Sequence, residues 1–436
     1  MAVEAFPFEP VKTRSRRRSA TVPVEYHLLL LLTLGLVAFG LIMVYSASSG
    51  TAVAQGLDPL GGLVKEAVYA VIGVVMMAVA ARVSYRRWRM FAPLLILLTL
   101  GLLGAVLVPH VGVQVLGARR WIALGPLTVQ PSELAKGSMA LFAAAVLSAR
   151  KRGPRTVLEL LRPIGLMALL VCALVVLEPD LGTAVSIVIM TTGVLVVAGT
   201  PVRLLMGAFA MLATLAGAVV SQNAYMHQRL LVFLHPFQDA GGAGYQNAQA
   251  LIALGSGGLF GKGLGNGTEK ILYLPVAPSD MIGAVIGEEL GLVGIALTAL
   301  AFAGFALLGM RIALRCTDPF GKFLAAAVTS LICGQAFVNL GVVLGMLPLT
   351  GVPLPLISSG GSSLVVTLTL VGMLLNIAET GAARGRKGRT TNVSTTDADA
   401  AEATPKRPRR PTRADSRGGN RRARGAGAGG RRRAHG

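Results

Sequence analysis

The chain has 436 residues, of which 53% are hydrophobic and only 14% are charged, whereas an ordinary soluble protein has about 25% charged residues. This composition excludes a soluble enzyme and indicates an integral membrane protein. The apolar runs contain no strands of alternating polarity, so an all-α membrane fold is favoured over an outer-membrane barrel.

The apolar runs predict ten transmembrane helices, because a hydrocarbon core about 30 Å thick needs about 20 apolar residues per helix. In chain order we expect spans at residues 27–47, 62–81, 90–108, 131–149, 162–178, 181–198, 201–220, 281–309, 320–344 and 361–380. Lys and Arg, which gather in short cytoplasmic loops, fall in both tails and after every second span. Both termini are therefore predicted to be cytoplasmic.

The net charge of +21 is concentrated in the tails, which supply +2 in residues 1–26 and +12 in residues 381–436. A polybasic segment beside a membrane is first a ligand for anionic lipid headgroups, so no nucleic-acid partner is expected. The composition of the second tail predicts disorder. The expected organisation is a basic cytoplasmic tail at 1–26, a ten-helix domain at 27–380, and a disordered basic cytoplasmic tail at 381–436.

One extracytoplasmic loop, residues 221–280, is far longer than ordinary connections of about 2 to 6 residues, and long ordered loops are usually functional. It contains a candidate helix at 245–254 and a Gly-rich stretch at 255–263. The stretch is not a Walker A loop, because Ser256 and Gly263 stand where that motif requires Gly and Ser or Thr. No nucleoside triphosphate pool exists outside the membrane, so a substrate must arrive activated, as lipid-linked pyrophosphates do.

Two arginines, Arg119 and Arg120, lie on the extracytoplasmic side, where the charge bias disfavours them. They could extend to lipid headgroups, with Trp121 as an interfacial anchor. Alternatively they could clamp a phosphate, for which the planar guanidinium group is well suited.

Acidic residues also mark the starts of the fourth and sixth spans. Glu133 and Lys136 are three residues apart and could form a local ion pair or belong to a substrate site. Asp180, in the turn between the fifth and sixth spans, could simply begin a helix.

Asp280 opens the eighth span, where a helix N-terminus favours the ionised carboxylate that a general base needs. The alternative is an ordinary helix cap. Glu288 and Glu289 lie about 12 Å further along the same helix on different faces. At most one of them is expected to share a cavity with Asp280, and a buried polar contact between helices is the alternative for both.

Several segments together match one family pattern: residues 117–121, 130–136, 178–182, 286–291 and 339–363, the last with Asn339, Gly345, Pro348, Gly351 and the run 356–363. On these segments the chain resembles the SEDS family (shape, elongation, division and sporulation), whose members are peptidoglycan polymerases with ten transmembrane helices. The resemblance covers about residues 27–380. Arg119-Arg120 before Trp121, together with Lys270, resembles the division branch more than the elongation branch.

The resemblance implies polymerisation of lipid II with inversion of the anomeric carbon, and it assigns the general base to Asp280. Arg119, Arg120 and Lys136 would meet the charge of the leaving pyrophosphate, and Glu133 and Asp180 would orient these cations. Ser359 and Gly360, before the last span, either make a tight helix start or line the cavity for the lipid substrate.

One departure from the family concerns the residues just before Asp280. Members usually read Pro-Glu-x-His-Thr-Asp, whereas Val276 and Pro278 stand at the Glu and His positions here. The base is kept, and any proton relay or loop contact supplied by the Glu and His is lost.

The resemblance also implies partners and a location. A class B penicillin-binding transpeptidase is the expected partner at the division septum of the cytoplasmic membrane, and the basic tail would bind cytoplasmic division proteins or anionic lipids. A divalent cation could help to neutralise the pyrophosphate, although no ligand cluster in the sequence points to one. The alternatives are a lipid II flippase and a non-catalytic scaffold of the division machinery.

Overall fold

A computed structural model describes residues 23–380 except 110–111, 116–117, 126, 151–152, 223–231, 236, 238–241, 243 and 272. These residues belong to one compact unit. Nearly all of the two predicted tails, and residue 117 of the predicted Arg-Arg-Trp segment, lie outside the described part.

Helices occupy most of this unit, and one of them lies in each of the ten ranges predicted from the apolar runs. In chain order they are α1 (Val24–Ala54), α2 (Gly61–Arg82), α3 (Tyr85–Leu107), α4 (Pro131–Ala149), α5 (Val157–Leu160), η1 (Leu161–Gly165), α6 (Leu166–Leu177), α7 (Leu181–Val197), α8 (Val202–Gln222), α10 (Tyr245–Gly257), α11 (Ile282–Arg315) and α12 (Pro319–Val343), followed by a last helix at Ser362–Thr380.

Seven helices in the described residues are long and apolar enough to cross a membrane. They are Val24–Ala54, Gly61–Arg82, Tyr85–Leu107, Val157–Leu177, Ile282–Arg315, Pro319–Val343 and Ser362–Thr380. The chain is therefore a multi-pass helical membrane protein, as the composition predicted.

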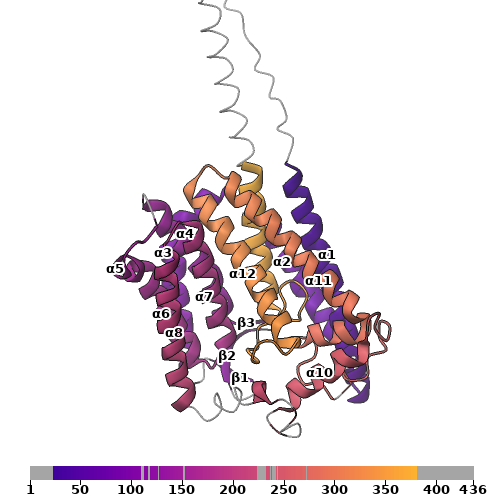
Figure 1. Cartoon of the computed structure of the whole chain (residues 1–436). Coiled ribbons are helices and arrows are strands. Elements are labelled where there is room, and N and C mark those ends of the chain that lie inside the picture. Colours follow the sequence, from indigo (N-terminus) through magenta and orange to yellow (C-terminus); the bar gives the residue numbers. More distant parts are fainter. Residues whose placement is uncertain are drawn as a thin grey trace, which may run out of the picture. The chain divides into compact units, whose positions relative to one another are not determined.

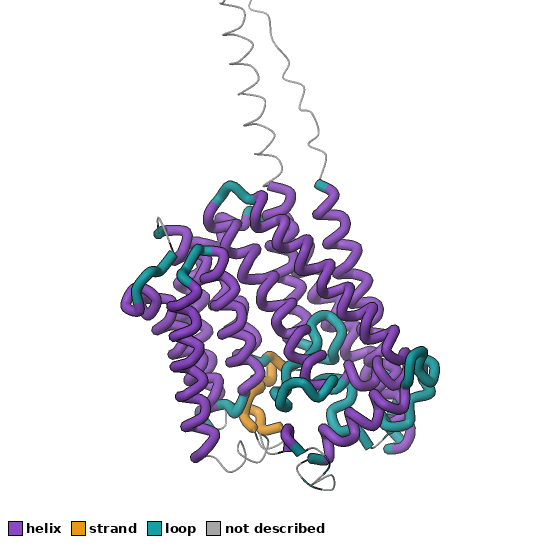
Figure 2. Tube along the Cα trace, in the orientation of Figure 1, coloured by secondary structure: helices purple, strands orange, loops and turns teal. Residues whose placement is uncertain are grey.

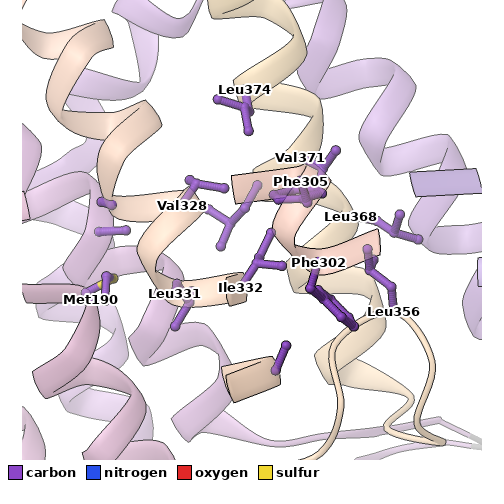
Figure 3. Packing of buried hydrophobic residues seen from close by; sticks show 14 of the residues in the cluster. Met190, Phe302, Phe305, Val328, Leu331, Ile332, Leu356, Leu368, Val371 and Leu374 are labelled. Atoms are coloured by element: carbon purple, nitrogen blue, oxygen red, sulfur yellow. The ribbon is translucent and has the colours of Figure 1, made fainter. Parts of the chain in front are cut away.

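The centre of the unit is formed by α12, which packs against α11, α7 and α4. Figure 3 shows Phe302 and Phe305 of α11 among aliphatic side chains of α12 and the last helix, including Ile332 and Leu368. Small residues let the helices approach closely, as at Gly193, where a Cβ would collide with the side chain of Ser330. This close packing fixes the helix ends that carry the polar residues.

A small antiparallel sheet, which sequence reasoning did not predict, lies between α3 and α4. Its strands are β1 (Val113–Val115), β2 (Ala118–Leu124) and β3 (Leu127–Val129), in the order β1-β2-β3. Figure 1 shows the sheet and α10 at the same end of the helical unit, and Figure 2 shows that many of the loops gather there. That end corresponds to the side predicted to be extracytoplasmic. The helix predicted at 245–254 is confirmed as α10.

The Gly-rich stretch has a structural role in this fold. Helix α11 is interrupted at Gly291, whose φ of 68° is non-helical. The chain at 258–263 docks into the break: the amides of Lys262 and Gly263 donate to the carbonyls of Glu288 and Glu289 at 3.0 Å. A Cβ on Gly291 would lie 2.5 Å from the amide nitrogen of Gly261. Glycine at position 291 therefore allows this close backbone contact.

Candidate active site

The main chain leading to Asp280 is held at three consecutive carbonyls, and we call this arrangement the main-chain clamp. The carbonyl of Pro278 accepts from the amide of Ser359 at 2.8 Å. The carbonyl of Ser279 accepts from Ser358 Oγ at 2.7 Å, and that of Asp280 accepts from Asn339 Nδ2 at 2.8 Å. Helix α12 and the loop before the last helix therefore fix the backbone at Asp280.

Asp280 is partly exposed, although its backbone is fixed. Ser279 Oγ donates to Asp280 Oδ1 at 3.4 Å, and Oδ2 would lie 3.4 Å from a Cβ at Gly351. Helix α11 begins at Ile282, and Met281 occupies the N-cap position without a side-chain cap. Asp280 thus precedes the helix by two residues and does not occupy its N-cap position.

Asp180 is surrounded by donors and is only 6% exposed. As the N-cap of α7 it accepts from the amide of Thr183 at 3.1 Å and from its hydroxyl at 2.8 Å. Gln130 Nε2 and Ser132 Oγ, from the start of α4, each donate to Asp180 Oδ2 at 2.9 Å. The prediction that Asp180 begins a helix is confirmed, and its carboxylate also joins α7 to α4.

Glu133 and Lys136 form a buried ion pair within α4. Lys136 Nζ lies 2.6 Å from Glu133 Oε2, and the two side chains are 2% and 5% exposed. Apart from this contact, neither atom has a hydrogen-bond partner among the described residues. The predicted local pair is therefore present, and the ammonium group retains donors for a ligand.

The two arginines of β2 have different environments. Arg120 Nε donates to the carbonyl of Glu178 at 2.8 Å, and its Nη2 donates to that of Pro179 at 2.5 Å. Arg119 is exposed and makes no ion pair or side-chain hydrogen bond within the described part of the chain. Successive strand residues point to opposite faces, so the side chains of Arg119 and Arg120 leave β2 on opposite sides. Arg120 holds the turn, and Arg119 is available to a ligand.

Glu178, which sequence reasoning did not select as a site residue, lies in the turn after α6 and is 1% exposed. Neither of its carboxyl oxygens has a hydrogen-bond partner among the described residues. The pKa of Glu178 is raised to about 8, mainly by burial and also by the negative charge of Asp180, while the positive charge of Arg120 acts in the opposite direction. Glu178 therefore carries a proton near neutral pH.

The segment 350–352 connects the surroundings of Asp180 and Asp280. A Cβ on Gly182 of α7 would lie 2.8 Å from the carbonyl oxygen of Thr350. On its other side, Gly351 adjoins Asp280 Oδ2. The start of α7 and the segment before α11 thus meet across this loop, which brings the predicted site residues to the same end of the helical unit.

Glu288 and Glu289 hold the outer loop against α11. Glu288 accepts from Lys262 Nζ and from the amide of Thr268, each at 2.8 Å. Glu289 accepts from Lys270 Nζ at 2.5 Å and from Ser46 Oγ at 2.7 Å. Among the residues that the structure describes, the expected contact between helices is found at Glu289, through Ser46 of α1. The prediction that placed Glu288 and Glu289 on the same helix as Asp280 is wrong for Asp280, because that residue lies before the helix begins.

Ser359 and Gly360 form hydrogen bonds with other segments of the protein. The Ser359 amide belongs to the main-chain clamp, and Ser359 Oγ donates to Glu66 Oε2 of α2 at 2.9 Å. The Gly360 amide donates to Glu66 Oε1 at 3.4 Å. These contacts favour the tight helix start, and the lining of a substrate cavity stays a prediction. Sequence reasoning missed Glu66, although a carboxylate inside an apolar run is a recognisable signal.

The described residues contain no group of three or more His, Cys, Asp or Glu side chains that could hold a metal ion. The predicted divalent cation therefore finds no such cluster in this part of the chain. The three cysteines, Cys172, Cys316 and Cys333, are free thiols.

Comparisons with solved structures support the same architecture. A chain from a structure described as "Structural coordination of polymerization and crosslinking by a peptidoglycan synthase complex" superposes with a TM-score of 0.67 at 30% identity. The match covers 80% of this chain and 96% of that chain. The rod shape determining protein RodA of Thermus thermophilus matches with a TM-score of 0.57 at 31% identity, covering 80% of this chain and 95% of that one.

Sequence comparisons agree with this likeness. A probable peptidoglycan glycosyltransferase FtsW of Geobacter metallireducens is 39% identical over 350 residues, 80% of this chain and 93% of the relative. The protein of the same description from Mycobacterium tuberculosis is 40% identical over 377 residues, 85% of this chain and 71% of the relative. A family model for FtsW, RodA and SpoVE, described as "Cell cycle protein", matches residues 26–382. The resemblance found in the sequence is thus confirmed, and the chain belongs to the FtsW/RodA/SpoVE family, the SEDS proteins.

Proposed function

We propose that this chain is a peptidoglycan glycosyltransferase that polymerises lipid II at the outer face of the cytoplasmic membrane during cell division. The names of its FtsW relatives support the activity. The observation that carries the proposal is the position of Asp280, a partly exposed residue whose backbone is fixed by the main-chain clamp. A carboxylate on a fixed backbone is preorganised to accept a proton.

The reaction joins the GlcNAc 4-hydroxyl of one chain to the MurNAc anomeric carbon of another. The new carbon–oxygen bond forms as the bond to undecaprenyl pyrophosphate breaks, so the anomeric centre inverts. Asp280 takes the hydroxyl proton as general base. The electron pair of the broken bond leaves with the pyrophosphate, whose developing charge must be met by fixed cations.

Lys136 and Arg119 are our candidates for these cations. Lys136 is buried and keeps donors beyond its contact with Glu133, and Arg119 is exposed at the edge of the same region. Glu133 orients Lys136 through their ion pair. Arg120 and Asp180 support the site through the turn and the helix starts that they hold.

The proposed topology has ten spans with both termini in the cytoplasm and basic tails at 1–26 and 381–436. A helix lies in each of the ten predicted ranges, which supports the span count. A class B penicillin-binding transpeptidase is the proposed partner at the septum. The structural relative described as coordinating polymerization and crosslinking in a complex supports such a pairing. The C-terminal tail would recruit cytoplasmic division proteins or anionic lipids.

Glycan-strand formation from purified lipid II tests the proposal directly. Wild-type protein with its cognate transpeptidase should make polymer, and Asp280→Asn should make none while staying folded. Transport of lipid II across vesicles by both proteins, without polymer from either, would favour a flippase. A complex that stays intact but makes no polymer, from a protein that cells still need for division, would favour a scaffold.

A further inference from the structure

Glu66 is a buried carboxylate that the proposed mechanism does not use. It lies near the start of α2, is 4% exposed, and sits in a predominantly apolar helix. A charge in such a place is costly unless hydrogen-bond donors compensate it. Its donors come from a loop 293 positions away in the sequence: Ser359 Oγ at 2.9 Å and the Gly360 amide at 3.4 Å.

Tyr69, three residues further along α2, contacts the next residue of the same loop. A Cβ on Gly361, where φ is 39°, would lie 2.9 Å from the Tyr69 ring. The Tyr69 hydroxyl accepts from the amide of Thr128 on β3 at 3.0 Å. One face of α2 therefore contacts residues 359–361 and also the sheet whose middle strand carries Arg119 and Arg120.

The loop held by Glu66 is also the loop that holds the backbone before Asp280. Ser359 donates through its side chain to Glu66 and through its amide to the carbonyl of Pro278. Ser358, its neighbour, donates to the carbonyl of Ser279. Two of the three contacts of the main-chain clamp thus depend on the placement of a loop whose other side is bound to α2.

We propose that Glu66 is a positioning residue for Asp280, acting through Ser359 and the main-chain clamp. The inference rests on the proposed function, because Asp280 matters only if it is the base. An ionised carboxylate accepts from both donors, whereas the amide of Gln would direct its own N–H groups toward one of them. A displacement of about 1 Å at a reacting group can reduce a rate about 100-fold.

The kinetic experiment compares wild type, Glu66→Gln, Ser359→Ala and the double variant in lipid II polymerisation per folded molecule. We expect each single variant to lower kcat about tenfold with little change in KM, and the double variant to be no slower than the worse single one. Glu25→Gln is the matched control, because Glu25 accepts from Arg315 at the other end of the neighbouring helix α1. Its kcat should equal that of wild type.

Hydrogen exchange provides a readout that does not require activity. Glu66→Gln should speed amide exchange in peptides covering residues 276–281 and 357–362, whereas Glu25→Gln should leave both unchanged. Unaltered exchange there, or a wild-type kcat in Glu66→Gln, would overturn the inference. A wild-type protein that makes no polymer would contradict the proposed function instead. The exchange result would still decide whether Glu66 holds the Asp280 segment.

Discussion

The two aspartates of the candidate site are held in opposite ways. At Asp180 the protein holds the carboxylate, which accepts four hydrogen bonds from Gln130, Ser132 and Thr183. At Asp280 it holds the backbone through three consecutive carbonyls, in a residue that is partly exposed. The donors around Asp180 fix the orientation of its carboxylate, which joins α7 to α4. The comparison agrees with the proposed roles, in which Asp280 takes the proton and Asp180 supports the site.

The largest expected loss of stability follows from breaking the ion pair between Lys270 and Glu289, which holds the outer loop against α11. Lys270→Met would leave Glu289 as a buried charge without its cation, which typically costs about 3 to 5 kcal/mol. Thermal unfolding in detergent measures the effect. The double variant Lys270→Met/Glu289→Gln should recover part of the loss, and additive effects would show that the pair is not coupled.

A variant at Asn339 tests whether the main-chain clamp serves activity as well as stability. Its side chain donates to the carbonyls of Asp280 and Val352, each at 2.8 Å. Asn339→Ala would leave both acceptors unpaired and should reduce the free energy of unfolding by about 2 kcal/mol or more. Polymerisation per folded molecule should fall as well.

Asn376 is a matched control for Asn339, because its buried side chain also makes two main-chain hydrogen bonds, to Tyr85 and Ala81. Asn376→Ala should lose comparable stability and keep the wild-type rate per folded molecule. Equal losses of rate in both variants would mean that the clamp has no special connection to Asp280.

Conservative changes at the two arginines distinguish Arg120, which holds the turn at Glu178 and Pro179, from Arg119, which is available to substrate. Arg120→Lys cannot reproduce both contacts with the turn and should lower stability by about 1 kcal/mol. Arg119→Lys should leave the melting temperature unchanged. The same loss in both variants would contradict the different environments of the two side chains.

A pH dependence of stability is expected from Glu178. Its pKa rises from 4.5 to about 8 in the folded protein, so between these values the folded state retains a proton that the unfolded state has lost. Stability from this group is present below about pH 4.5 and is lost as the pH rises through about 8. The melting temperature of Glu178→Gln minus that of wild type should therefore be larger at pH 9 than at pH 5. A difference that does not change with pH would contradict the raised pKa.

The helices could be predicted from sequence because each depends on a local property, the length of an apolar run. The cap at Asp180 and the pair between Glu133 and Lys136 were also accessible, since their partners lie within three residues. The sheet was missed because two of its strands have only three residues.

Other parts of the site depend on contacts between distant segments, which composition and spacing do not reveal. The partners of Glu66 lie more than 290 positions away, and those of Asn339 belong to two different loops. The break at Gly291 was also invisible, because the hydrogen bonds that compensate it come from residues 258–263. Family resemblance could locate Asp280, and only the structure shows how its backbone is held.

The most direct test of the account compares Asp280→Asn with Asp180→Asn in one preparation, measuring both thermal stability and polymerisation of lipid II per folded molecule. The account predicts that Asp280→Asn melts near the wild-type temperature and loses at least about 100-fold in rate. Asp180→Asn should melt at a clearly lower temperature, because its buried donors lose a charged acceptor. A wild-type rate of polymerisation in Asp280→Asn would contradict the central claim.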